Sequence, residues 1–297
     1  MTRYLIFLML FLGINHASSQ DKYKLPKALN EISGLEKFND SVLIAINDSG
    51  NSPDIYFINL KGNILKKCRV TNALNYDWED LTMDDKGNLF IADVGNNLND
   101  RKNLCILKLN AKAAFQNDSI SVEKIFFSYV GQRFFPPKAS SCKYNCEAIY
   151  WKNDSLHLIT KNESKNPKNS KRKIYSDWNR YPEDYVISDK PGVYMAQQNQ
   201  SHIDYLHKVS NKGILDLVTS IDYENGMIAI LTYSEIRTFR INENNTITTI
   251  EKGWGTKHFK KLAQREALVI FSDKLIYIAT EKHPLLGGPF IYKKAFE

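Results

Sequence analysis

Ten polar positions recur at equivalent points of a repeated pattern, and carboxylates dominate them. Two residues before an apolar anchor, the five repeats carry Ser33, Glu79, Glu147, Thr219 and Glu266. At the end of the strand that follows each anchor, they carry Asp48, Asp93, Lys161, Tyr233 and Glu281. Six of these ten residues are acidic, and Lys161 is the only cation. Carboxylate oxygens at this density could bind a hard cation. Two of the carboxyl groups could also act as a catalytic acid and base.

Three interpretations of this acidic set stay open. In the first, the carboxylates accept hydrogen bonds from backbone amides of neighbouring units and hold the units together. In the second, carboxylates bind Ca²⁺ or Mg²⁺, and the candidate ligands are Asp48, Asp93, Glu79, Glu147 and Glu266. In the third, two close carboxyl groups with separated pKa values hydrolyse a substrate. Convergence of Glu79, Glu147 and Glu266 on an open cavity would favour a metal or catalysis, and burial in interfaces would favour a structural role.

The repeats that carry these residues share one plan of strands. Each begins with a short apolar strand, turns at an Asn-, Asp- or Gly-containing loop and continues as a strongly apolar strand. From the anchor to the polar residue that closes the second strand there are always 12 or 13 residues, and the anchors are Leu35, Leu81, Ile149, Ile221 and Leu268. Third strands are expected at 54–58, 103–107, 173–175, 236–240 and 290–292. Fourth strands are expected at 64–70, 122–127, 203–209 and 246–252.

A recurring four-stranded unit predicts an all-β protein of the β-propeller class. Five blades are recognisable, and anchor intervals of 68 and 72 residues leave room for a sixth. The last unit lacks a fourth strand, so we expect residues 23–29 to supply it and close the ring, because an open ring exposes sheet edges. In an antiparallel hairpin the start of one strand lies beside the end of the next. Both polar sets are therefore predicted to surround one mouth of the central channel.

The first twenty residues predict export. They combine Arg3, an apolar run over 4–14 and small residues at Ala17 and Ser19, which is typical of a signal peptide. The run is too short to span a bilayer, and no later stretch qualifies. We expect a periplasmic or extracellular protein with residues 1–20 as signal peptide and 21–297 as a single propeller domain. An oxidising compartment would allow up to two disulfides, with pairing left open, among Cys68, Cys105, Cys142 and Cys146.

The formal net charge of +7 does not predict a nucleic-acid partner, because lysine is spread along the whole chain. A small-molecule, glycan or protein ligand at the channel mouth is expected instead. We expect the protein to be a monomer.

Several strings resemble a family of exported bacterial propellers that is common among the Bacteroidetes and loosely grouped with the TolB-like and SdiA-regulated propellers. They are Ile32-Ser-Gly-Leu35, Asn47-Asp-Ser-Gly-Asn51, Asp77-Trp-Glu-Asp80, Asp93-Val-Gly-Asn-Asn97, Thr160-Lys-Asn162 and Gln264-Arg-Glu-Ala267. The resemblance covers nearly the whole mature chain and implies the propeller fold but no reaction. Neighbouring groups include phytase-like and lactonase-like esterases, whose metal-binding pattern this chain does not reproduce.

Two functions are compatible with this sequence. One is a binding module that recognises a ligand at a carboxylate-rich mouth, with or without a divalent cation. The other is a metal-dependent hydrolase of the phosphoesterase, lactonase or glycosidase type that uses the same carboxylates. We favour the binding module, because propellers serve many unrelated roles and a fold alone names no reaction.

Overall fold

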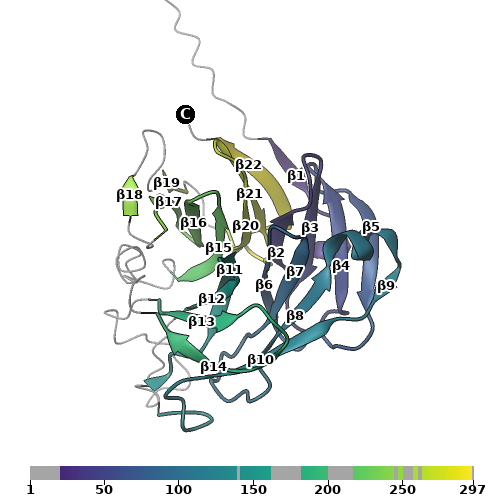
Figure 1. Cartoon of the computed structure of the whole chain (residues 1–297). Helices are drawn as coiled ribbons and strands as arrows, with labels where there is room; N and C mark the ends of the chain where they lie inside the picture. Colours follow the sequence, from purple (N-terminus) through teal and green to yellow (C-terminus); the bar gives the residue numbers. More distant parts are fainter. Residues whose placement is uncertain are drawn as a thin grey trace, which may run out of the picture.

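The computed structural model describes residues 21–138, 141–161, 182–199, 217–243, 247–249, 257–259 and 263–295, which form a five-bladed β-propeller (Figure 1). One strand of each blade lines the channel. These inner strands are β2 (Ile32–Lys37), β6 (Trp78–Met83), β11 (Cys146–Lys152), β15 (Val218–Glu224) and β20 (Arg265–Ser272). Each packs against the next, and β20 packs against β2, so the contacts close a ring of five. The predicted fold class is confirmed, and the ring formed by the described residues has no place for a sixth blade. We number the blades I to V in the order of these strands.

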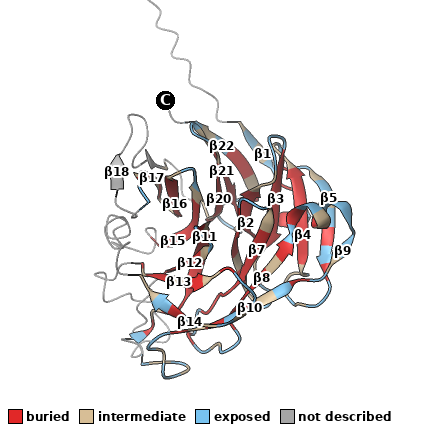
Figure 2. Cartoon of the chain, viewed as in Figure 1, coloured by how far each residue is buried: buried red, intermediate tan, exposed pale blue. Residues whose placement is uncertain are grey.

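The second strands carry the core. They are β3 (Val42–Asn47), β7 (Asn88–Asp93), β12 (Ser155–Thr160), β16 (Met227–Thr232) and β21 (Leu275–Thr280). Every residue of these strands is buried, except the first residue of three of them (Figure 2). Successive side chains of a strand point to opposite faces. In β3, Val42, Ile44 and Ile46 pack toward blade II, whereas Leu43 and Ala45 pack toward blade V. Because each blade is covered on both faces, these strands are uninterrupted apolar runs rather than alternating ones.

The outer strands complete the blades and close the ring. Third strands are β4 (Asp54–Asn59), β8 (Cys105–Asn110), β13 (Asp184–Ser188), β17 (Glu235–Ile241) and β22 (Phe290–Ala295). Fourth strands are β5 (Ile64–Val70), β10 (Glu123–Tyr129), β14 (Gly192–Gln198) and β18 (Ile247–Thr249). In blade V the fourth strand is β1 (Lys22–Lys24), which pairs antiparallel with β22. The expected closure of the ring by the N-terminal segment is therefore confirmed.

Blade III differs from the sequence-based expectation. Its third and fourth strands are β13 and β14, whereas strands were expected at 173–175 and 203–209, which lie outside the described residues. The outer edge of β14 pairs in parallel with β10 of blade II, for example Phe126 with Val193. Blade I gains a fifth strand, β9 (Ser119–Ile120), beside β5, next to the short helix α1 (Ala111–Gln116). Pairing of outer edges limits the unpaired backbone that a blade presents. The remaining short elements are the 3-10 helix η1 (Lys27–Leu29) and β19 (Lys257–His258).

The structure does not test the expected signal peptide, but it does describe the four cysteines. Residues 1–20, the expected signal peptide, lie outside the described residues. Within the described part of the chain, no helix has the length and apolar character needed to cross a membrane. The four cysteines are buried as thiols, and no disulfide joins them.

Buried polar side chains hold neighbouring blades together along the channel. Asp80 on β6 accepts hydrogen bonds from the Ile149 amide of blade III (3.1 Å) and from the Ser220 hydroxyl of blade IV (3.5 Å). Asp222 on β15 accepts from the Ile270 amide of blade V (2.7 Å). Burial raises the pKa of Asp80 well above its usual range. The structural interpretation of the carboxylates thus applies to Asp80 and Asp222, which are not among the ten mouth positions.

Replacing Asp80 with alanine is expected to lower the free energy of unfolding by about 2 kcal/mol, because a backbone amide and a hydroxyl from two other blades lose their buried acceptor. Urea unfolding at pH 7 measures this. The matched control is Asp40→Ala, since the Asp40 side chain is 95% exposed and its ion pair with Lys37 contributes little. Equal stabilities of the two variants would contradict the assignment.

Candidate cation site at the channel mouth

Five β-bulges place one residue of each inner strand at the channel mouth. The register between inner and second strand skips one residue in every blade. A bulge of this kind bends the strand and redirects a side chain. The five bulged residues are those that the sequence aligned two positions before each anchor: Ser33, Glu79, Glu147, Thr219 and Glu266.

The bulged residues surround a cavity of about 140 Å³. Twelve of the described residues line it, namely Ile32, Ser33, Asp48, Glu79, Asn97, Glu147, Lys161, Thr219, Tyr233, Gln264, Glu266 and Glu281. Seven of the eight site residues expected from the sequence are in this set, and Ile32 is its only aliphatic member. The volume corresponds to roughly five water molecules, so it suits an ion or a small polar ligand.

Asp93, the eighth expected residue, does not line the cavity. It pairs with Trp78, as Asn47 pairs with Ile32 on β2. Asp93 is therefore equivalent to Asn47 and not to Asp48, and this shift of one residue turns a strand side chain to the opposite face. Its carboxylate forms an ion pair with Arg101 at 2.8 Å. The expectation that Asp93 belongs to the carboxylate ring, and to a metal site there, is corrected by this register.

Asp77, which the spacing argument did not select, completes an acidic triad with Asp48 and Glu79. Each of the three offers a carboxylate oxygen, and these oxygens all lie within 4.8 Å of one another. The backbone oxygen of Asp77 accepts hydrogen bonds from the Val94 and Gly95 amides, both at 3.1 Å. A Cβ added at Gly95 would collide with the carboxylates of Asp77 and Glu79. The glycine in Asp93-Val-Gly-Asn-Asn97 therefore gives these side chains their space.

The triad has raised pKa values for identifiable reasons. Burial and the neighbouring Asp77 raise the pKa of Asp48 to about 6, while a hydrogen bond from the Ser49 amide opposes the shift. Burial and the carboxylates of Glu147, Asp48 and Asp77 hold the pKa of Glu79 well above its usual range. Each pKa unit corresponds to about 1.4 kcal/mol of preference for the neutral form. A cation bound between these groups would displace the protons that they hold.

The other side of the cavity contains its own cation. The Lys161 ammonium is 3.0 Å from a Glu147 carboxylate oxygen and 5.7 Å from the ring centre of Tyr233. Burial raises the pKa of Glu266 to about 8, and Lys161 opposes this shift. Glu281 belongs instead to the side of the triad, since burial and the Asp48 carboxylate raise its pKa to about 7. Among the described residues that line the cavity, Lys161 is the only basic one. The triad between blades I and II, away from the Lys161–Glu147 ion pair of blade III, is therefore the group of carboxylates that could hold a metal ion.

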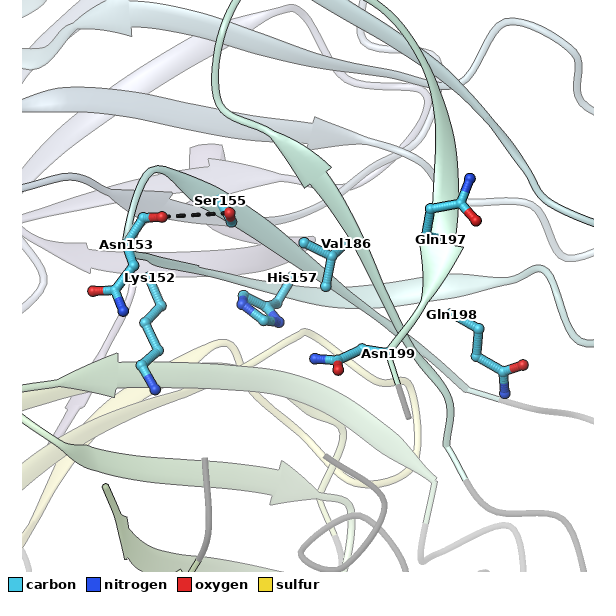
Figure 3. A pocket seen from close by; sticks show the side chains of 8 residues that line it. All are labelled: Lys152, Asn153, Ser155, His157, Val186, Gln197, Gln198 and Asn199. Atoms are coloured by element: carbon cyan, nitrogen blue, oxygen red, sulfur yellow. Dashed lines mark hydrogen bonds between the residues drawn. The ribbon is translucent and has the colours of Figure 1, made fainter. Parts of the chain in front are cut away.

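A larger pocket of about 400 Å³ lies on blade III, near the hairpin turn at the opposite end of β11 (Figure 3). Its lining includes Lys152, Asn153 and His157. His157 lies 3.0 Å from the Asp184 carboxylate through Nδ1, and its ring stacks on Tyr150 with centroids 4.3 Å apart. These two contacts fix the buried histidine within the blade. His157 is therefore a packing residue of blade III. The channel mouth is a stronger candidate functional site than this pocket.

No protein-family model matches the chain, and no curated protein matches it either. Similar solved structures are β-propellers. The PQQ-bound aldose sugar dehydrogenase of Streptomyces coelicolor is 10% identical, with a TM-score of 0.48 over 93% of this chain and 98% of that chain. A streptogramin B lyase is 12% identical, with a TM-score of 0.41 over 93% and 97%. These values bear on the fold alone, and the resemblance to TolB-like and SdiA-regulated propellers stays a prediction.

Proposed function

We propose that the chain is an exported binding module whose channel mouth holds a divalent cation, Ca²⁺ or Mg²⁺, together with a small polar ligand. The observation that carries the proposal is the convergence of the Asp48, Asp77 and Glu79 carboxylates within 4.8 Å of one another at one side of a polar cavity. Export rests on the signal-peptide pattern of residues 1–20.

The charge of the cavity supports a cationic occupant. In the described part of the chain, five acidic residues line it and Asp77 adds a sixth carboxylate beside them, whereas Lys161 is the only base in the lining. Like charges at this density favour protonation of some carboxyl groups. A divalent cation at the triad would allow the same groups to ionise.

The donor atoms suit a hard cation. Ca²⁺ takes six to eight oxygen ligands in flexible geometry, and Mg²⁺ takes six and keeps several waters. Asp48, Asp77 and Glu79 would supply three or more of these oxygens. The remaining positions would face the cavity, where water or an oxygen of the ligand completes the shell. The cation would thereby connect the protein to its ligand.

Thermal unfolding with Ca²⁺, Mg²⁺ or a chelator tests the proposal. A cation that binds only the folded state stabilises it by about 2.7 kcal/mol at a hundred times its Kd. We expect Ca²⁺ or Mg²⁺ to raise the melting temperature and the chelator to reverse the rise. Glu79→Gln is expected to abolish the response, and Glu123→Gln, at an exposed position on β10, is expected to keep it. A wild-type melting temperature that none of the three additions changes would overturn the proposal.

A further inference from the structure

The hydroxyl of Thr219 has no hydrogen-bond partner among the described residues, although the side chain is buried and lines the mouth cavity. Thr219 is 2% exposed. Buried hydroxyls nearly always have a partner, so an exception calls for a partner beyond the described residues, such as a bound water or a ligand. The bulge in β15 places this residue at the position that Glu79 and Glu147 occupy in their blades.

Thr219 lies across the channel from the acidic triad. In the ring of inner strands, β15 packs against β11 and β20, whereas the triad belongs to the blades of β2 and β6. A ligand that reaches from a cation at the triad to Thr219 must therefore cross the cavity. The unpartnered Thr219 hydroxyl is an observation separate from the clustering of the carboxylates. It indicates where the end of the ligand farthest from the cation would be hydrogen bonded.

The groups near Thr219 are suited to hydroxyls. Tyr233 and Gln264 line the same side and bring a phenol and an amide. Both are uncharged groups that donate and accept hydrogen bonds, as a threonine hydroxyl does. Tyr233 is hydrogen bonded to Glu266, which uses the phenol proton and leaves the phenol oxygen to accept a hydrogen bond from a ligand hydroxyl. This wall of the cavity therefore offers hydrogen bonds to an uncharged polar ligand.

Charge and polarity narrow the class of ligand further. The excess of carboxylates over Lys161 disfavours an anion, even beside a divalent cation. The nearly complete absence of aliphatic side chains from the twelve lining residues disfavours an apolar ligand. A neutral compound with several hydroxyls avoids both penalties, because its oxygens can complete the shell of a hard cation.

We propose that the mouth cavity binds a small neutral polyhydroxy compound, with two neighbouring hydroxyls on the cation held by Asp48, Asp77 and Glu79 and a further hydroxyl hydrogen bonded to Thr219. The inference rests on the proposed function, since it needs the cation. A cavity with room for roughly five waters accepts a molecule of about the size of glycerol, or the edge of a sugar. Thr219 is a ligand-binding residue in this account and does not contact the cation.

Saturation-transfer NMR on the full chain with saturating Ca²⁺ tests the inference. The probes are glycerol, 1,3-propanediol as a diol without neighbouring hydroxyls, acetate as an anion and methylammonium as a cation. The protein variants are Thr219→Val, which keeps the shape and removes the hydroxyl, and Thr219→Ser, which retains it. A parallel Ca²⁺ titration measures cation binding by each protein without any probe.

We expect glycerol to bind more tightly than the other three probes and to lose its signal when the chelator is added. Thr219→Val should weaken glycerol binding by about three- to tenfold, the effect of one hydrogen bond, and leave Ca²⁺ affinity unchanged. Thr219→Ser should restore glycerol binding. Preference for acetate, methylammonium or propanediol would overturn the inference, as would equal glycerol affinity in Thr219→Val. Ca²⁺ binding without any glycerol signal would overturn the inference and leave the proposed function standing, whereas absence of Ca²⁺ binding would overturn both.

Discussion

Replacing Asp77 with asparagine is expected to lower the affinity for Ca²⁺ by about a hundredfold. The substitution removes one of three converging carboxylate charges but preserves the shape of the side chain, and ligand charge count is a main determinant of Ca²⁺ affinity. A hundredfold change corresponds to about 2.7 kcal/mol of binding free energy. Isothermal titration of Ca²⁺ into the chelator-treated protein measures the effect.

Asp93→Asn is the matched control for this prediction. Asp93 lies in the same blade and is buried, but its carboxylate pairs with Arg101 and is absent from the cavity lining. It also accepts a hydrogen bond from the Asp77 amide (3.1 Å), which the side-chain oxygen of asparagine can keep. We expect Asp93→Asn to bind Ca²⁺ within about threefold of the wild type, a difference of roughly 0.6 kcal/mol. Loss of binding in Asp93→Asn with binding kept in Asp77→Asn would contradict this assignment. It would make Asp93, the residue predicted from the sequence spacing, the cation ligand instead of Asp77.

Raising the pH from 5 to 8 is expected to destabilise the cation-free protein and to increase its stabilisation by Ca²⁺. The pKa values of Asp48, Glu281 and Glu266 are raised to about 6, 7 and 8 in the folded state. The unfolded chain releases these protons near pH 4. The folded state thus binds more protons between pH 4 and pH 8, so its stability falls as the pH rises through this window. Ca²⁺ at the triad replaces the protons held there by Asp48 and Glu79, and it therefore stabilises most at the upper end.

Urea unfolding at pH 5, 6.5 and 8, with chelator or with Ca²⁺, measures this dependence. Glu266→Gln removes the carboxyl group with the highest pKa of the three, about 8, and should flatten the loss of stability between pH 6.5 and pH 8. Groups with lowered pKa values, such as Asp189, change protonation below this window and do not mask it. A cation-free protein whose stability stays level or rises from pH 5 to pH 8 would contradict the account.

Much of the scaffold could be predicted from the sequence because the hairpin unit repeats. Two local features of this unit are readable in the sequence. One is the apolar second strand, which is buried on both faces. The other is the turn with positive φ at both central residues, as in Asn153-Asp154 and Asn225-Gly226. The equivalence of Glu79, Glu147 and Glu266 followed from the same repeat, since each occupies a bulge. Repetition made these residues comparable without any knowledge of their contacts.

The remaining features depend on register and on contacts between distant segments. A length of 12 or 13 residues from anchor to strand end conceals whether Asp93 or Val94 is equivalent to Asp48, and only the pairing of Trp78 with Asp93 decides it. Asp77 lies outside the strand pattern, and its position depends on how the segment at Gly95 folds back. The parallel pairing of β10 with β14 joins segments that are about 70 residues apart, which no local pattern predicts.

Calorimetric titration of Ca²⁺ at pH 8, repeated in two buffers with different ionisation enthalpies, tests the central claim most directly. We expect one Ca²⁺ per chain and a heat that differs between the buffers, because Ca²⁺ displaces protons from the triad. Glu79→Gln should show neither the binding nor the proton release. Absence of binding to the wild type, or binding that Glu79→Gln leaves unchanged, would contradict a cation site at the channel mouth.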